Sequence, residues 1–127
     1  MHREDVSRWL ERYVAAWTSG ERAEIESLFS DEARYRYHSY DEPVVGPAAI
    51  ADSWFEEPDE PGSFEASYKC YAVDGDAAVA IGTSTYLAEG EVDKVYDNVF
   101  LLRFDADGRC SDFTEWYVKR PSASQSQ

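Results

Sequence analysis

The sequence has 127 residues, of which 43% are hydrophobic and 15% aromatic, and its formal net charge is -14. A chain of this length holds one domain, and its apolar content excludes a disordered protein. Because 26 acidic residues face 12 basic ones, neither nucleic acid nor a membrane is expected as a partner. No apolar run approaches bilayer length and no signal peptide is recognisable, which predicts a cytoplasmic protein.

Three helices are predicted in the first half of the chain. Apolar residues recur at helical spacing through residues 3–18, and Ser19-Gly20 ends this helix. A shorter helix is expected over residues 21–29. Proline is favoured in the first turn of a helix, so the third helix begins at Pro47 and runs to about Glu56.

The remainder is expected to form a sheet. Residues 33–40 alternate in polarity and predict one short strand, followed by the loop DEPVVG. An acidic connection over residues 56–62 is read as a surface loop, and the tail 122–127 as disordered. Turns at DGD, EGE and DADG separate four long strands, which form an antiparallel meander: residues 64–73, 77–87, 92–104 and 109–119.

This order predicts an α+β fold in a single domain of residues 1–121. A twisted antiparallel sheet of four long strands and one short strand curls into a cone, with the three helices packed on its concave face. The cone opens at one end and offers a cavity for a small molecule.

The last two long strands form the inner wall of this cone. A slip of one residue would set Asp97 against Glu115, so the register without that repulsion is preferred. One face then carries an aromatic surface with Asn98 and Glu115 set into it. A four-residue loop at residues 105–108 gives the following pairs: Phe100 with Phe113, Asn98 with Glu115, and Tyr96 with Tyr117.

The segments ERYVAAWTSGERAEIESLFSDEARYRYHSYDEPVVGPAAI and RFDADGRCSDFTEWY, together with the order of elements, resemble the nuclear transport factor 2-like superfamily. The likeness is strongest to its SnoaL-like and ketosteroid-isomerase-like branch and runs from Trp9 to about Pro121. In these relatives the positions of Phe100, Phe113 and Tyr117 point into the cavity, which agrees with the register above. The superfamily contains isomerases, dehydratases, cyclases, epoxide hydrolases and transport adaptors, so the resemblance implies a fold and no single activity.

The likeness to ketosteroid isomerases can be followed residue by residue. Their catalytic tyrosine falls on Tyr13, their general-base aspartate on Tyr37, and their second oxyanion-hole donor, an aspartic acid, on Phe100. Since that reaction needs a carboxylate to move the proton and two donors to hold the enolate, a ketosteroid isomerase is not expected. The Asp-Arg-Asp constellation of limonene-epoxide-hydrolase-like members is not recognisable either.

Glu115 is the sharpest candidate for chemistry. Burial on an aromatic wall raises the pKa of a carboxyl group, which can then exchange a proton near neutrality. Asn98 would orient it or bind a substrate oxygen, and Tyr13 would be a second polar anchor. These three residues are the predicted catalytic set, for lyase, isomerase or cyclase chemistry on a small apolar, oxygen-bearing molecule, polycyclic compounds included. The alternative is that Glu115 is a hydrogen-bonded structural acid.

Large rings and two threonines form the predicted pocket wall: Trp17, Tyr35, Tyr37, Trp54, Thr83, Thr85, Tyr96, Phe100, Phe113 and Tyr117. The alternative is that the rings fill the cone, leaving a non-catalytic dimeric binding or interaction module. His38 alternates with Arg34 and Arg36, which places it at the surface or in a turn. A general base at the cavity mouth is the other interpretation of His38.

The outer face of the sheet carries an apolar strip that the helices leave uncovered, and its members are Val99, Leu101, Trp116 and Val118. Relatives of this fold commonly dimerise sheet to sheet, so a homodimer through this face is expected. No metal-ligand spacing, phosphate loop or dinucleotide fingerprint is present, and neither a metal nor a cofactor is predicted. Cys70 and Cys110 are expected to be reduced, partly buried thiols.

Overall fold

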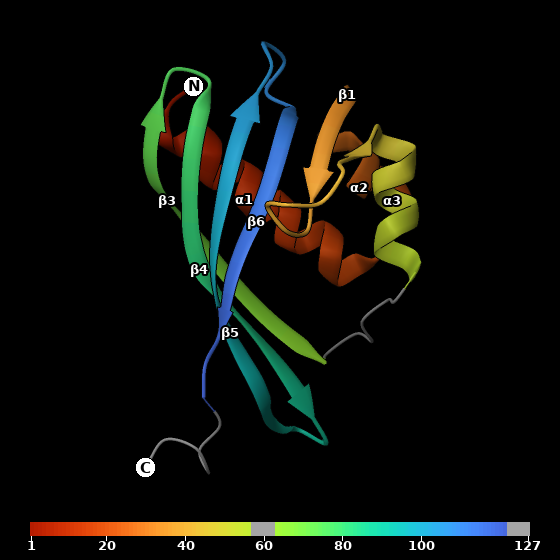
Figure 1. Ribbon diagram of the computed structural model, residues 1–127, viewed down its shortest axis with the longest axis vertical. Coiled ribbons are helices and arrows are strands. Elements are labelled where there is room, and N and C mark those ends of the chain that lie inside the picture. Colours follow the sequence, from red (N-terminus) through yellow and green to blue (C-terminus); the bar gives the residue numbers. More distant parts are fainter. Residues whose placement is uncertain (57–62, 122–127) are drawn as a thin grey trace.

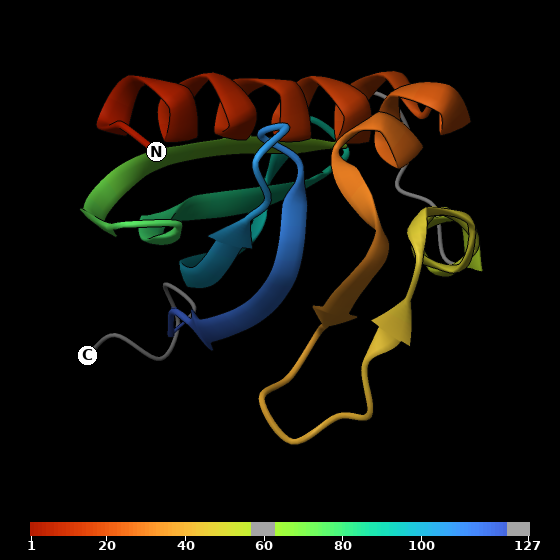
Figure 2. The same cartoon turned by 90° about the horizontal axis from the view of Figure 1, so that it is seen from above.

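The computed structural model describes residues 1–56 and 63–121. The predicted α+β class is confirmed, with helices gathered on one side of a curved, cone-like sheet (Figures 1 and 2). The predicted surface loop within residues 57–62 and the predicted disordered tail 122–127 lie outside the described residues. The elements follow in the order α1 (Arg3–Ser19), α2 (Arg22–Ser27), β1 (Phe29–Arg36), β2 (Val44–Val45), α3 (Pro47–Glu56), β3 (Phe64–Asp74), β4 (Ala77–Ala88), β5 (Glu91–Phe104) and β6 (Cys110–Lys119).

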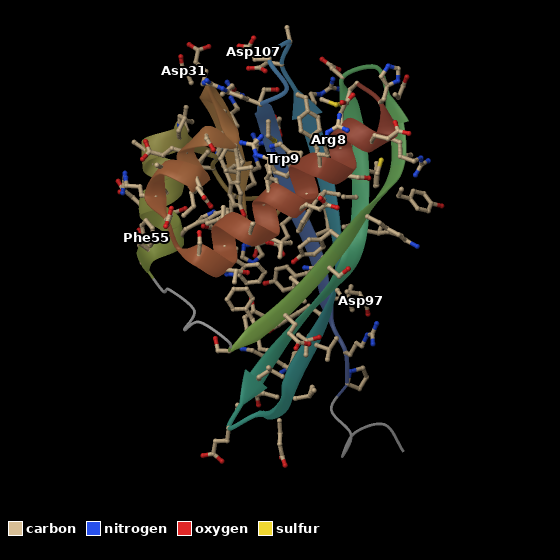
Figure 3. The ribbon with its side chains drawn as sticks, turned by 180° about the vertical axis from the view of Figure 1, so that it is seen from behind. Arg8, Trp9, Asp31, Phe55, Asp97 and Asp107 are labelled. Atoms are coloured by element: carbon tan, nitrogen blue, oxygen red, sulfur yellow. The ribbon has the colours of Figure 1, made fainter. Side chains whose placement is uncertain are left out.

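Helix α1 crosses one face of the sheet (Figure 2) and is capped at both ends. The backbone nitrogen of His2 donates to Asp5 Oδ2 at 2.8 Å, which satisfies a free donor at the helix start. Gly20 takes the left-handed conformation (φ 67) and its N–H donates to the Ala16 carbonyl at 3.0 Å. The predicted end at Ser19-Gly20 is thereby confirmed. Trp9, on the buried side of α1 (Figure 3), donates from Nε1 to the Leu28 carbonyl at 3.0 Å.

The strand order is β2-β1-β6-β5-β4-β3. All neighbouring strands are antiparallel except β1 and β6, which run parallel. The predicted wholly antiparallel sheet is therefore wrong at this pair. The rest of the sheet and α3 lie between β1 and β6 in sequence, so no tight turn links these two strands. A hairpin turn would force them to run antiparallel, and without one they can run parallel.

Two boundaries in the first half also differ from the prediction. Helix α2 ends at Ser27, and β1 covers Phe29–Arg36 rather than residues 33–40. The helical spacing of apolar residues predicted that this helix continues to residue 29. Phe29 instead pairs with Cys110 of β6, so strand pairing overrides that spacing. Strand β2 lies in the predicted DEPVVG loop, where Val44 pairs with Tyr35 of β1.

The register of β5 and β6 is two residues away from the predicted one. Two irregularities add one residue each. The hairpin loop has three residues, because Asp105 N donates to the Arg109 carbonyl at 2.9 Å, and Ser111 is an extra residue in β6. A shift of two keeps every side chain on its predicted face, so Asn98 and Glu115 still point inward. The observed pairs are Phe100 with Glu115, Asn98 with Tyr117, and Leu102 with Phe113.

Strand β4 presents the opposite face from the one predicted. Ser84 pairs with Tyr96, whereas Thr83 pairs with Asp97 and Thr85 with Val95 on the outer face. The prediction that Thr83 and Thr85 line the cavity is therefore wrong. The cause is a bulge in β5, where Asp93 is an extra residue between the Leu87–Val92 and Tyr86–Lys94 pairs.

Aromatic rings fill the deep part of the cone. Tyr35 and Phe113 stack at 4.4 Å between centroids, and Tyr13 stacks on the same Phe113 ring at 5.5 Å. Phe100 lies 4.7 Å from Phe113, and all four side chains are buried. Phe100 and Phe113 therefore belong to packed core rather than to an open pocket wall, and Tyr35 packs against Phe113.

Both cysteines are buried and unpaired. No helix in the described ranges is long and apolar enough to cross a membrane.

Candidate functional site

An open cavity of about 420 Å³ lies on the concave face beyond the packed rings. Its lining comes from β4, β5, β6 and Tyr37, the residue that follows β1, and the β4–β5 hairpin extends past the helices (Figures 1 and 3). We call it the Glu115 cavity, and its lining residues are Tyr37, Ser84, Tyr86, Lys94, Tyr96, Asn98, Glu115 and Tyr117. Five of these residues were predicted from the sequence, namely Tyr37, Tyr96, Asn98, Glu115 and Tyr117, whereas Ser84, Tyr86 and Lys94 were not.

Glu115 is partly buried in this wall, and desolvation raises its pKa to about 7. Two weaker effects act in the other direction: a hydrogen bond from Asn98 and the charge of His38. The carboxyl group thus exists in both protonation states near neutral pH. That property is the one a general acid or base requires.

Asn98 holds Glu115 through a chain of two hydrogen bonds. Ser84 Oγ donates to Asn98 Oδ1 at 2.9 Å, and Asn98 Nδ2 donates to Glu115 Oε2 at 3.0 Å. Ser84 and Asn98 are the buried polar residues of the described chain, at 4% and 3% exposure. Since the amide is fixed from both ends, it orients the carboxyl group rather than offering itself fully to a ligand.

A second polar chain reaches the cavity from the loop after β1. His38 Nδ1 lies 3.0 Å from Asp41 Oδ2, and His38 Nε2 lies 2.9 Å from the hydroxyl of Tyr117. A carboxylate only accepts, so Nδ1–H donates to Asp41, and the neutral ring accepts the Tyr117 hydroxyl proton at Nε2. His38 does occupy a bend, as predicted, yet its ring contacts a cavity residue.

Tyr13, the predicted second anchor, belongs to a different compartment. Its hydroxyl lies 3.2 Å from the Tyr35 hydroxyl inside the core, and burial raises the pKa of both tyrosines well above the usual value. Tyr13 lines a separate cavity of about 130 Å³ with Trp17, Tyr35, Tyr37 and Trp54 among its walls. Among the described residues, only Tyr37 lines both cavities, and its hydroxyl is hydrogen-bonded to Ser53 Oγ at 2.7 Å.

The predicted catalytic set is therefore brought together in part. Glu115 and Asn98 are in contact, whereas Tyr13 does not line their cavity. Trp17 stacks on Phe64 at 4.0 Å, and Trp54 lies edge-on to Tyr13 at 5.3 Å, so both contribute mainly to packing. Within residues 1–56 and 63–121, no three metal-ligating side chains gather in one place.

The apolar strip predicted on the outer face is exposed. Val99 is 37% exposed, Leu101 44%, Trp116 49% and Val118 70%. These residues lie on one face of β5 and β6, where Val99 pairs with Trp116, and form one patch on the side opposite the Glu115 cavity.

Comparisons with known proteins agree with this architecture. Residues 10–113 match the family model described as a SnoaL-like domain. A crystal structure of an NTF-2-like protein of unknown function from Burkholderia xenovorans LB400 superposes with a TM-score of 0.69 and 18% identity, covering 94% of this chain and 88% of that chain. An LEH-like epoxide hydrolase of M. tuberculosis gives a TM-score of 0.66 and 14% identity, with 91% and 84% covered.

At these identities the two structures are evidence for the fold alone, and the search of curated proteins found no match. The family model covers most of the chain. The protein is therefore a member of the SnoaL-like domain family, with the nuclear transport factor 2-like fold.

Proposed function

We propose that this protein binds a small, planar, oxygen-bearing molecule in the Glu115 cavity and that Glu115 transfers a proton to or from it. The observation that carries this proposal is a carboxyl group with a pKa of about 7 in the wall of an open cavity. Purely structural acids are usually neutralised by a cation or placed at the surface. The described residues include no ion pair for Glu115.

The cavity wall suits a ring-shaped ligand. Tyr86 and Tyr96 meet edge to face at 5.8 Å, and Tyr96 and Tyr117 do so at 5.4 Å, so their rings present flat apolar surfaces with hydroxyl groups between them. A ligand carbonyl or hydroxyl near Glu115 would receive its proton. The ionised form would remove a proton from carbon next to a carbonyl group, as in lyase, isomerase or cyclase reactions.

The Tyr117 hydroxyl, with His38 and Asp41 behind it, gives the same cavity a second proton-transfer route. The Tyr117 hydroxyl donates a hydrogen bond to His38 Nε2, so it would take a proton from the ligand and pass its own to His38 while Glu115 supplies another proton to the ligand. Two proton-transfer groups in one cavity, Glu115 and the Tyr117–His38 pair, fit a reaction that removes one proton and adds another.

Binding can be tested by mapping amide chemical shifts during titration with a set of planar cyclic ketones and phenols. We expect shifts at Tyr37, Tyr96 and Glu115. Ser84→Val fills part of the cavity and should weaken binding at least fivefold, while its neighbour Thr83→Val changes the outer face and should leave affinity unchanged. Chemical-shift changes confined to residues of the outer sheet face, or equal ligand affinities of the two variants, would contradict the proposal. For an identified substrate, Glu115→Gln should abolish turnover.

A second candidate function is a dimeric binding or interaction module, which the exposed patch of Val99, Leu101, Trp116 and Val118 supports. In this proposal two copies pair through their outer sheet faces. Trp116→Lys should then convert a dimer into a monomer in light scattering. Tyr71→Lys alters another exposed aromatic residue, on β3, and should leave the mass unchanged. A monomeric wild type, or a Trp116→Lys variant that remains dimeric, would remove this interface.

A further inference from the structure

We propose that the ligand of the Glu115 cavity carries a carboxylate or a similar single anionic group, and that Lys94 binds it. This inference rests on the proposed function and names its ligand class. Among the described residues, Glu115 is the only acidic side chain that lines this cavity and Lys94 the only basic one. They face the ligand from different positions on the wall.

Lys94 is held against the cavity wall by aromatic rings. Its Nζ lies 5.2 Å from the centroid of Tyr86 and 6.0 Å from that of Tyr96, both of which line the cavity. Such cation–π contacts hold the ammonium group close to the rings. The side chain is partly buried rather than extended into solvent.

Lys94 is unpaired although acidic residues surround it in sequence. Glu89, Glu91 and Asp93 all lie within five residues, and the chain has a net charge of -14. Yet none of the ion pairs among the described residues includes Lys94, and no hydrogen-bond acceptor is recorded for its Nζ there. Its three N–H donors are therefore available to an acceptor in the cavity.

Lys94 also forms no ion pair with Glu115. The groups that shift the pKa of Glu115 include Asn98 and His38 but not Lys94, which indicates that the two charges lie well apart. Along β5, Lys94 and Asn98 share a face and are separated by four residues, or about 13 Å of strand. A ligand with one anionic end and one reacting oxygen would thus span the wall between Tyr86, Tyr96 and Glu115.

This arrangement favours an anionic planar molecule over a neutral one. The carboxylate would accept charge-assisted hydrogen bonds from Lys94, while the ring would lie on the tyrosines and the other end would approach Glu115. Keeping the anion at Lys94 also separates it from the Glu115 carboxyl group, whose ionised form would repel it.

The test compares 2-naphthoate with 2-naphthamide, a neutral molecule of the same shape, by isothermal titration calorimetry at pH 6. Lys94→Met removes the charge and keeps most of the side-chain length, whereas Lys94→Arg keeps the charge. We expect Lys94→Met to lower the affinity for 2-naphthoate at least tenfold and the affinity for 2-naphthamide less than twofold. Lys94→Arg should bind both probes with an affinity close to that of wild type. Lys69→Met, which removes an exposed lysine of β3 from outside this cavity, should bind both probes as wild type does.

The outcomes separate this inference from the proposed function. If both probes bind in the cavity with equal affinity, or if Lys94→Met binds 2-naphthoate as tightly as wild type, the anionic ligand class is wrong and the cavity remains a binding site for neutral rings. If neither probe shifts the amide signals of Asn98 and Glu115, planar rings do not bind there, and both proposals are contradicted.

Discussion

Asn98 Nδ2 lies 3.0 Å from Glu115 Oε2, although the two residues are diagonal neighbours across β5 and β6 rather than a directly opposed pair. The diagonal leaves Tyr117 opposite Asn98 and Phe100 opposite Glu115. One neighbour of the carboxyl group is therefore packed core and the other is a half-exposed ring at the cavity mouth. This placement desolvates Glu115 while keeping it within reach of a ligand.

Glu115→Gln should change how stability depends on pH. The pKa of Glu115 is about 7 in the folded protein against 4.5 for an ordinary glutamate, so the folded state holds a proton that the unfolded chain releases between these values. Stability from this group is full below pH 4.5 and is lost as pH rises toward 7. In urea unfolding, wild type should lose about 2 kcal/mol relative to Glu115→Gln between pH 5 and pH 8. A constant difference between the two proteins would contradict the shifted pKa.

Asn98→Ala should raise the pKa of Glu115 further. The amide donates to the ionised carboxyl group, so its removal withdraws the hydrogen bond that favours the charged form. The variant also removes the Asn98 acceptor of the buried Ser84 hydroxyl, which costs about 1 kcal/mol because Tyr68 remains a hydrogen-bond partner of Ser84. Carbon-detected NMR titration measures the first effect and urea unfolding the second. An unchanged or lower pKa would mean that Asn98 does not act on Glu115.

His38 should occur as the Nδ1–H tautomer when its ring is neutral. Asp41 accepts at Nδ1, which leaves Nε2 to accept the Tyr117 hydroxyl proton. Nitrogen-15 shifts of the ring distinguish the two tautomers, and Asp41→Asn should increase the share of the Nε2–H form. If wild-type His38 is mainly in the Nε2–H form, Tyr117 donates no proton to it and the second proton route fails.

Gly82→Ala should destabilise the protein by about 2 kcal/mol or more. Gly82 pairs with both Tyr68 and Asn98, and a Cβ there would overlap the Ser67 carbonyl oxygen and lie 2.7 Å from Tyr68 Cα. Both atoms belong to the backbone and cannot move aside cheaply. Gly75→Ala meets open space and strains only a positive φ of 61, so it should cost about 1 kcal/mol. Equal losses in thermal unfolding would show that β3 and β4 relax around the new methyl group.

Helical spacing and strand length were sufficient to predict the elements, since α1, α3 and the four long strands lie close to their expected bounds. The inward face of β5 and β6 was also predicted, but through a register two residues away from the observed one. The three-residue loop and the Ser111 bulge happen to add up to an even number. Bulges leave no clear sequence signal, and each one moves the following side chains to the other face of the sheet. The sequence alone therefore does not fix which side chains of a strand point inward.

Strand β4 shows the consequence when the shift is odd. The single extra residue Asp93 reverses its face, so the β-branched Val79, Ile81, Thr83 and Thr85 lie outside. The small residues Ala80 and Ser84 lie inside, because the aromatic rings of neighbouring strands already occupy that space. This reversal of β4 is why the prediction that Thr83 and Thr85 line the cavity was wrong, and why Ser84 and Tyr86 were missed as cavity residues.

The direct test of the central claim is the pKa of Glu115 in the folded wild-type protein. A carbon-13 NMR titration of its side-chain carboxyl group, assigned by comparison with Glu115→Gln, measures this value without any substrate. The proposed function predicts a midpoint of about 7, where the group can both donate and accept a proton. A midpoint below 5 would mean that Glu115 is an ordinary ionised carboxylate at neutral pH, and the acid–base role proposed for this cavity would be wrong.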